Sequence, residues 1–189
     1  VKHRIGIDHV ENYQFVRDFV GTVSQAGCSV FIVHARNAWL QGLAAHRSTA
    51  ESVNGGRDNE LPALRSSTGA TPRRLSPKEN REVPPLRSEF VHRLKRDFPA
   101  LTFVLNGGLT QAQQIDAQLE QVDGVMLGRQ AYHHPWDLAA WDSRYFGAVP
   151  HALDRAQIEL KMVDYMETLA RQGVAWPHAA RHMLGLWHG

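Results

Sequence analysis

Cysteine is nearly absent from this sequence of 189 residues: Cys28 is the only one, so no disulfide can form within the chain. A lone thiol is typical of a reducing compartment such as the cytoplasm, where we expect this chain. Zinc would need further ligands at a recognisable spacing, and the sequence does not provide them. We therefore expect neither a disulfide framework nor a metal site.

Long hydrophobic runs are lacking as well. Apolar stretches such as residues 29–33 and 101–105 fall far short of the roughly 20 residues that cross a bilayer, so no membrane partner is expected. Residues 1–6 carry neither an initiator Met nor the features of a signal peptide. This start predicts that the sequence begins inside a longer protein.

Lysine is scarce, since only four of the 21 basic residues are lysines and the formal net charge is +2. Arginine suits recognition of phosphates and bases because its planar guanidinium presents several donors in a fixed geometry. A GC-rich genome would produce the same bias in any protein. The composition therefore leaves nucleic-acid binding open without establishing it.

Strand-like and helical patterns alternate along the chain. Residues 1–5 form a short apolar and basic run, residues 12–26 place apolar side chains at helical spacing, and residues 29–34 form a compact β-branched run. In the predicted helix we expect Phe15, Val16, Phe19, Val20 and Val23 to form one buried face.

The same alternation returns further along. Phe90, Val91, Leu94 and Phe98 mark a helix, residues 101–105 a strand, residues 110–119 a helix and residues 122–127 a short strand. Apolar strands that alternate with helices favour an α/β protein with a parallel sheet, either an open doubly wound sheet or part of a (β/α)8 barrel. The periodicity does not choose between these two.

From Pro135 onward only helical patterns occur, over residues 136–146 and 156–170, so we expect a small helical domain with a boundary near 148–154. Residues 44–75 are rich in Ser, Thr, Gly, Asn and Arg and lack a sustained apolar period. Structureless loops of this length are uncommon inside compact domains. This segment resembles linker or disordered sequence.

Candidate functional residues follow the predicted strands. The carboxyl ends of parallel strands meet at one edge of a sheet, and His34, Asn106-Gly107-Gly108 and Gly128-Arg129 all stand at such ends. Lys2 joins them if its side chain faces the barrel axis. Cys28 precedes its strand, so we expect it at the opposite edge as a small buried residue.

Glycine-bearing strand ends followed by helices allow close approach of backbone amides to a phosphate. Two consecutive ends of this kind, one with Arg129, favour phosphate binding over plain turns. Lys2 and His34 could polarise an electron-poor ring. Neither residue indicates nucleophilic catalysis.

Several motifs resemble a known family. They are residues 1–8 (VKHRIGID), 31–36 (FIVHAR), 39–43 (WLQGL), 76–82 (SPKENRE), 106–108 (NGG), 123–129 (DGVMLGR) and 181–186 (RHMLGL). Together they resemble tRNA-dihydrouridine synthase, subfamily A. The resemblance covers nearly the whole chain except residues 44–75, and the run over residues 76–86 argues against another phosphate-binding barrel enzyme.

The resemblance implies the C-terminal half of a TIM (β/α)8 barrel over residues 1–150, followed by the start of an all-helical tRNA-binding domain over 151–189. It implies FMN as cofactor, NADPH as reductant, and reduction of uridine to dihydrouridine at positions 20/20a of the tRNA D-loop. By resemblance the FMN contacts are Lys2, His34, Asn106, Gly107, Gly108, Gly128 and Arg129. Lys78, Arg81 and Arg36 would contact tRNA.

The family pattern also implies two departures. The catalytic Cys and the rest of the flavin site belong to a first half that this sequence does not contain, so we expect no catalytic residue here and no activity unless another polypeptide supplies that half. A half barrel would leave two sheet edges and one inner face exposed. Residues 44–75 separate Leu43 from Ser76, which are adjacent in the family pattern. The rival hypothesis is a non-catalytic fragment that binds RNA or has no function.

Overall fold

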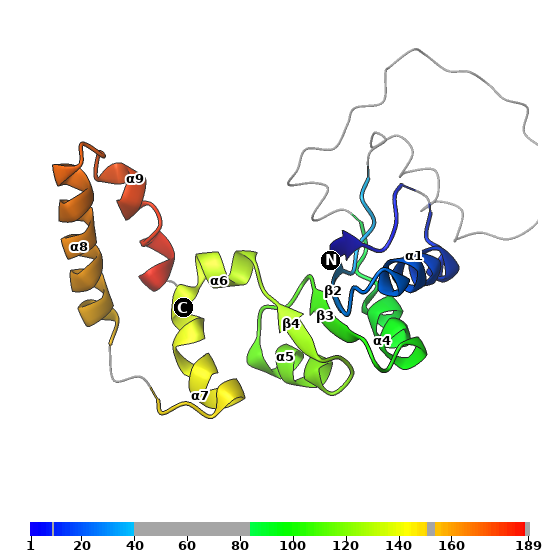
Figure 1. The fold of residues 1–189 in the computed structure, drawn as a ribbon. Helices are drawn as coiled ribbons and strands as arrows, with labels where there is room; N and C mark the ends of the chain where they lie inside the picture. The colour runs from blue at the N-terminus through cyan, green and yellow to red at the C-terminus, as the bar shows by residue number, and fades with distance from the viewer. Residues whose placement is uncertain (9, 40–83, 151–153, 188–189) are drawn as a thin grey trace, which may run out of the picture. The chain divides into compact units, whose positions relative to one another are not determined.

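The computed structural model describes residues 1–8, 10–39, 84–150 and 154–187 (Figure 1). The chain divides into two compact units. The first contains Val1–Gly108 and Ile115–Met126, and the second contains Leu109–Gln114 and Leu127–Gly189. The segment 44–75, which we expected to be an insertion, lies outside the described residues, as do Lys78 and Arg81.

A sheet of four parallel strands forms the centre of the first unit. The strands are β1 (Lys2–Arg4), β2 (Val30–His34), β3 (Thr102–Asn106) and β4 (Gly124–Met126), adjacent in chain order. The predicted α/β class with a parallel sheet is thus confirmed. β4 is shorter than the predicted strand 122–127, because Val122 and Asp123 form the bend that leads into it.

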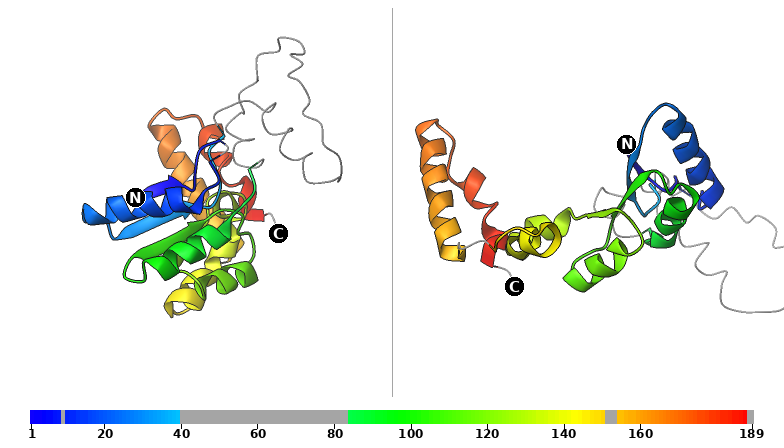
Figure 2. Two further views of the ribbon diagram at one scale, coloured as in Figure 1. Left: turned by 90° about the vertical axis from the view of Figure 1, so that its right-hand side faces the viewer. Right: turned by 60° about the horizontal axis from the view of Figure 1, so that its bottom comes forward.

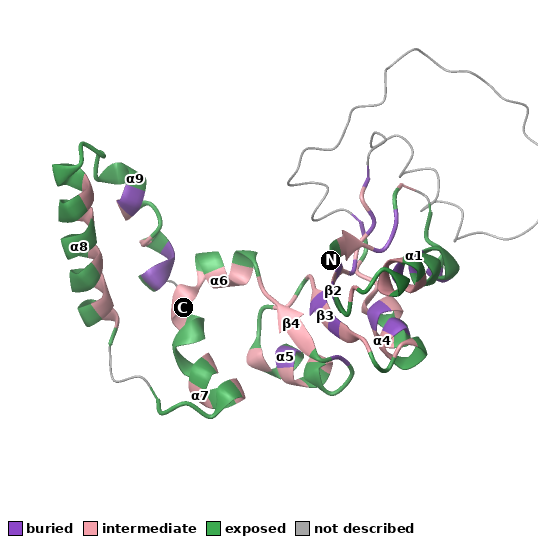
Figure 3. Ribbon diagram, viewed as in Figure 1, coloured by how far each residue is buried: buried purple, intermediate pink, exposed green. Residues whose placement is uncertain are grey.

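Helices cover one face of this sheet: α1 (Tyr13–Gln25), α4 (Ser88–Asp97) and α5 (Ala112–Leu119) (Figures 1 and 2). Alternate strand residues are buried beneath them, namely Phe31 and Val33 in β2 and Phe103 and Leu105 in β3 (Figure 3). The intervening residues are only half-buried. The core therefore lies between the helices and one face, and the opposite face is open within the described part of the chain.

α1 begins where expected, since the Asn12 side chain accepts a hydrogen bond of 2.8 Å from the Gln14 amide as an N-cap. Its buried residues are Tyr13, Val16 and Val20. The expectation that Phe15 and Phe19 belong to the buried face was wrong: they are 51% and 38% exposed. Phe19 packs on the His3 ring of β1, with ring centroids 4.9 Å apart, but stays partly exposed.

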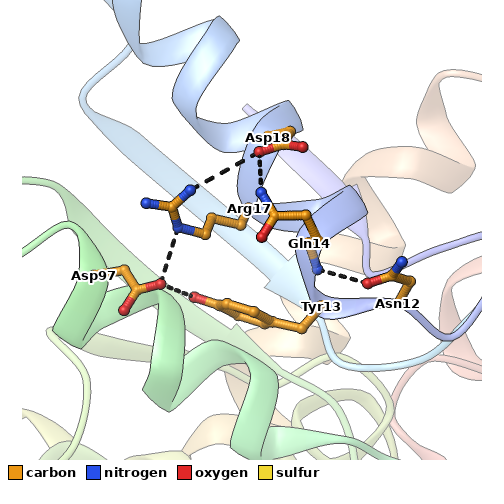
Figure 4. A network of polar contacts seen from close by, with 6 residues as sticks. All are labelled: Asn12, Tyr13, Gln14, Arg17, Asp18 and Asp97. Carbon is orange, nitrogen blue, oxygen red and sulfur yellow. Dashed lines mark hydrogen bonds and ion pairs between the residues drawn. The ribbon is translucent and has the colours of Figure 1, made fainter.

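A polar network joins α1 to α4 (Figure 4). The Tyr13 hydroxyl donates a hydrogen bond of 2.7 Å to the Asp97 carboxylate, and Arg17 Nε donates to the same oxygen at 3.1 Å. The Arg93 guanidinium lies over the Tyr13 ring, 3.9 Å from its centroid. These contacts fix the two helices against each other above β2 and β3.

Helices are the only regular secondary structure among the described residues of the second unit. Its elements are α6 (Arg129–His133), η2 (Pro135–Ala140), α7 (Trp141–Phe146), α8 (Arg155–Arg171), α9 (Pro177–Ala180) and η3 (Leu184–Trp187). The predicted helix 136–146 is divided between η2 and α7, whereas α8 matches the predicted helix 156–170. A capping box formed by Asp154 and Gln157 opens α8.

The second unit takes up the chain from Leu127, earlier than the expected boundary at 148–154, of which residues 151–153 are not described. The two compact units are defined by contacts in space, whereas the predicted domains are defined by a boundary along the sequence. The assignment of 1–150 and 151–189 to separate domains stays a prediction.

Candidate functional site

The strand register brings the candidate residues of the first unit onto one face. Arg4, His34, Asn106 and Met126 are mutual partners across the four strands, in the last row at their carboxyl ends. Lys2 lies in the row of Ile32, Val104 and Gly124. Because side chains alternate between faces along a strand, Lys2, His34 and Asn106 all project from the face that the helices leave open.

The backbone after β3 approaches the His34 ring closely. Gly107 has a φ of +127°, and a Cβ placed there would lie 3.2 Å from His34 Cδ2 and 2.7 Å from Leu86 Cδ2. Gly108 has a φ of +72°, and a Cβ there would overlap the Leu86 side chain. The positive φ therefore favours glycine at both positions, and a side chain there would also force Leu86 to move.

Asn106 fastens the end of β3 to β4. Its amide nitrogen donates a hydrogen bond of 2.8 Å to the Met126 carbonyl, and its backbone carbonyl accepts from the Ala35 amide at 3.0 Å. Donation through Nδ2 leaves Oδ1 as the side chain's acceptor on the open face. In the Asn-Gly-Gly turn the Asn106 side chain is therefore fixed by a hydrogen bond, and two glycines follow it, of which Gly107 is half-buried and Gly108 exposed.

Arg4 is a member of this row that we did not single out from the sequence. Its Nη1 donates a hydrogen bond of 2.6 Å to the Asn37 carbonyl. Asn37 is 3% exposed, and its side-chain amide donates to the Asp8 and Val10 carbonyls at 3.1 and 3.2 Å. The period of two from Lys2 would have placed Arg4 on the same face.

The remaining sequence candidates are distributed differently. Arg36 is half-buried just beyond β2, and its amide donates to the His34 carbonyl at 2.7 Å. Gly128 and Arg129 follow β4 and belong to the second unit, where both are exposed. Gly128 has a φ of −115°, and a Cβ added to it would meet no atom within 4 Å. Neither its conformation nor the described residues around it require glycine.

The amino-terminal edge of the sheet carries a structural ion pair. Lys95 Nζ lies 2.8 Å from Asp123 Oδ1 and also donates to the Pro99 and Leu101 carbonyls, while Asp123 Oδ2 accepts from the Phe103 amide at 2.8 Å. Desolvation opposes ionisation of Asp123, yet the hydrogen bonds from Lys95 and Phe103 prevail and lower its pKa.

Cys28 also lies before its strand, as expected, but it is half-buried rather than buried. Its sulfur is 3.5 Å from the Val1 amino group. The thiol therefore stands at the opposite end of β2 from His34, away from the row of candidate residues.

Neither a metal centre nor a membrane span emerges from the described residues. No three His, Cys, Asp or Glu side chains in this part of the chain are grouped to hold a metal ion. None of its helices combines the length and apolar character that crossing a bilayer requires.

Comparison with known proteins matches the entire chain, residues 1–189, to the model of the family described as "Dihydrouridine synthase (Dus)". Three similar relatives are all named tRNA-dihydrouridine(20/20a) synthase. The protein of Pseudomonas aeruginosa is 43% identical over 189 residues, which is 100% of this chain and 47% of the relative. That of Escherichia coli K12 is 42% identical over 190 residues, covering 100% of this chain and 46% of the relative.

The third relative, from Shewanella oneidensis, is 39% identical over 189 residues, covering 100% of this chain and 47% of its own length. The chain therefore spans about half the length of the curated relatives it matches. The family match covers every residue, including the strand ends that form the open face, and the chain belongs to the dihydrouridine synthase family.

Proposed function

We propose that this chain forms part of an FMN-dependent tRNA-dihydrouridine synthase and provides one half of its flavin-binding barrel. The observation that carries the proposal is the shared open face of Lys2, His34 and Asn106 at the carboxyl ends of parallel strands. Ligands of parallel α/β proteins bind at this edge. The helical second unit would be the start of a tRNA-binding domain.

The residues present fit a phosphate-bearing cofactor. Gly107 and Gly108 have positive φ angles, and a side chain at either position would crowd Leu86. A glycine backbone of this kind allows close approach of a phosphate. A Cβ at Gly128 would enter open space instead, so the described residues leave room for a ligand at this position. Gly128 and Arg129 are proposed as phosphate contacts by resemblance.

FMN, when bound, would supply hydride-transfer chemistry, with NADPH as the reductant. Lys2 and His34 would contact and polarise the flavin ring from the open face, while Asn106, Gly107 and Gly108 would hold the ribityl phosphate with Gly128 and Arg129. The His34 ring lies near the Gly107 turn, because a Cβ added to Gly107 would be 3.2 Å from His34 Cδ2.

The proposed substrate is uridine of the tRNA D-loop, at positions 20/20a, and the expected site of action is the cytoplasm. Lys78, Arg81 and Arg36 are proposed to contact the RNA, as Arg and Lys suit a phosphate backbone. The proton donor to the uracil ring is expected from a Cys outside this chain. Cys28 does not take that role, because it stands at the opposite edge of the sheet.

The test compares the purified 189-residue chain with the same chain mixed with the portion of the Pseudomonas aeruginosa relative that lies outside the matched region. Alone, the chain is expected to retain no yellow flavin and to form no dihydrouridine on unmodified tRNA. The mixture is expected to gain both properties. His34→Ala and Gly128→Ala are expected to lower flavin retention in the mixture, whereas Gly147→Ala, at the exposed C-cap of α7, is the control.

A mixture that forms a complex yet neither retains flavin nor modifies tRNA would contradict the proposal. Its main rival, a non-catalytic RNA-binding fragment, predicts that the chain alone shifts tRNA in a gel and gains no activity from the added portion. Stoichiometric flavin on the isolated chain would refute the expectation that one half is insufficient.

A further inference from the structure

One leucine side chain packs against the Asn-Gly-Gly turn. A Cβ built on Gly107 would lie 2.7 Å from Leu86 Cδ2, and a Cβ built on Gly108 would overlap Leu86 Cδ1. The two methyl groups of Leu86 therefore occupy the places where side chains of these two residues would stand. Because atoms in contact cannot overlap, the place of the turn depends on the place of Leu86.

The short segment that carries Leu86 is fixed on both sides. Before it, Pro84 is fully buried, and after it the Arg87 amide donates a hydrogen bond of 2.8 Å to the Ala35 carbonyl beyond β2. Arg87 is also the N-cap of α4, a position where Ser, Thr, Asp or Asn usually satisfies the first amides of a helix. The Arg87 side chain makes no capping hydrogen bond and is available for another contact.

That contact is with Glu11, which stands just before the N-cap of α1. Arg87 Nε and Nη2 donate to the two carboxylate oxygens of Glu11, both at 3.1 Å. The two side chains are 38% and 39% exposed, and an ion pair exposed to this extent contributes little to stability. A two-point contact does fix the orientation of a guanidinium. The pair therefore orients the chain beside Leu86 more than it stabilises the unit.

A turn that binds phosphate through its backbone needs such support from outside. Amide hydrogen bonds act over about 2.7–3.2 Å, so a small displacement of the turn weakens them. Gly107 and Gly108 have no side chains with which to pack. Asn106 fastens only the residue before them, through its hydrogen bond to the Met126 carbonyl. Leu86 supplies the packing that the two glycines lack.

We propose that Leu86 is a positioning residue for the cofactor phosphate and acts through the Asn-Gly-Gly turn. The Arg87–Glu11 pair holds Leu86 against that turn. The inference rests on the proposed function, which assigns the turn to the ribityl phosphate. Since the Leu86 side chain is a hydrocarbon, it makes no hydrogen bond to the phosphate itself. Its effect is confined to the part of the affinity for FMN that the phosphate contributes.

The test uses the full-length Pseudomonas aeruginosa relative in which these 189 residues replace the matched region, and it compares binding of FMN with binding of riboflavin, which lacks the phosphate. Leu86→Ala is expected to weaken FMN binding on the order of tenfold and to leave riboflavin binding unchanged. Leu86→Met, which restores most of the apolar volume, is expected to recover FMN binding. A change that only destabilised the fold would weaken both flavins alike.

The matched control is Leu101→Ala. Leu101 is a half-buried leucine just before β3, at the end of that strand opposite the turn. Its replacement is expected to leave the preference for FMN over riboflavin unchanged.

Three further variants test what holds Leu86 in place. Arg87→Gln, Glu11→Gln and the double variant are each expected to lower the preference for FMN by the same factor, because each breaks the same ion pair. Losses that add up in the double variant would show that the two side chains act separately, and they would overturn this role of the pair.

Amide signals of the glycine-labelled protein without flavin provide a second readout. Leu86→Ala is expected to shift the signals of Gly107 and Gly108, and Leu101→Ala to leave them in place. Unmoved glycine signals, or a parent protein and Leu86 variant with equal preference for FMN, would overturn the positioning role alone. A parent protein that binds neither flavin, or binds both equally well, would instead refute the proposed function that assigns the turn to the phosphate.

Discussion

Tyr13, the first residue of α1, donates its hydroxyl proton to Asp97, the last residue of α4, across a distance of 2.7 Å. The pair joins two helices whose sequence positions are 84 residues apart. Burial, followed by the hydrogen bond to Asp97, raises the pKa of Tyr13, and the same hydrogen bond is the main cause of the lowered pKa of Asp97. The residues therefore favour a neutral phenol beside an ionised carboxylate.

Tyr13→Phe is expected to reduce the stability of the first unit, and the reduction should depend on pH. The unfolded phenol ionises near pH 10, the folded one only at higher pH. The contribution of Tyr13 is therefore complete below pH 10 and declines as the pH rises above it. Hydrogen exchange at the buried β2 amides, compared for both proteins at pH 8 and above pH 10, measures the difference. An advantage of the parent protein that grows above pH 10 would be inconsistent with this linkage.

Gly107→Ala should destabilise the first unit by about 2 kcal/mol, because it combines a strained positive φ with an overlap against Leu86 and a tight contact with His34. Gly27→Ala is the matched control. Gly27 has a φ of +90° and no neighbouring atom within 4 Å, so its replacement isolates the backbone cost. That cost is expected to be about 1 kcal/mol. Equal losses for the two variants, measured by urea unfolding, would show that the close approach to His34 costs nothing.

Lys95→Met is expected to lower the free energy of unfolding by about 1 kcal/mol, since it removes a partly exposed ion pair and two hydrogen bonds to carbonyls. Asp123 would lose the partner that lowers its pKa, so its titration followed by NMR should move upward. Arg96→Met, at an exposed neighbouring position on α4, serves for comparison. An unchanged Asp123 titration in the Lys95 variant would rule out this assignment.

His3 should make the first unit less stable in mild acid. Desolvation lowers its pKa below the ordinary value of 6.5, and the charges of Lys2 and the amino terminus act in the same direction. The unfolded chain therefore binds a proton before the folded chain does, and stability is lost as the pH falls from 6.5 through the folded pKa. His3→Phe is expected to make the unfolding free energy less dependent on pH between 5 and 7.5. A steeper dependence in the variant would speak against a neutral buried ring.

The order of strands and helices in the first unit followed from sequence patterns, because β-branched runs and helical spacing are local properties. The face that α1 buries did not follow. Phe15 and Phe19 satisfy the helical period as well as Val16 and Val20 do, but burial depends on what lies across the sheet. β1 is an edge strand in the described residues, so one flank of α1 has nothing above it.

The candidate site residues, like the fold, were predictable only in part from the sequence. Strand-end position alone selected His34 and the Asn-Gly-Gly turn, and the register places them together. The hydrogen bond that Arg4 donates to the Asn37 carbonyl was not predictable. It depends on the segments after β1 and β2, which meet only in the folded chain, where Asn37 donates to the Asp8 carbonyl. Lys78 and Arg81, which lie outside the described residues, stay predictions.

The two units differ greatly in how much they bury. The described residues of the second unit bury only Ala179, Gly185 and Leu186, and α8 buries none, whereas the first unit encloses two stacked phenylalanines, Phe31 and Phe103. Heating should therefore melt the helical unit well before the sheet, and calorimetry should resolve two heat-absorption peaks. No single melting temperature would then describe this chain, and circular dichroism, to which the helices of both units contribute, would show two superimposed transitions.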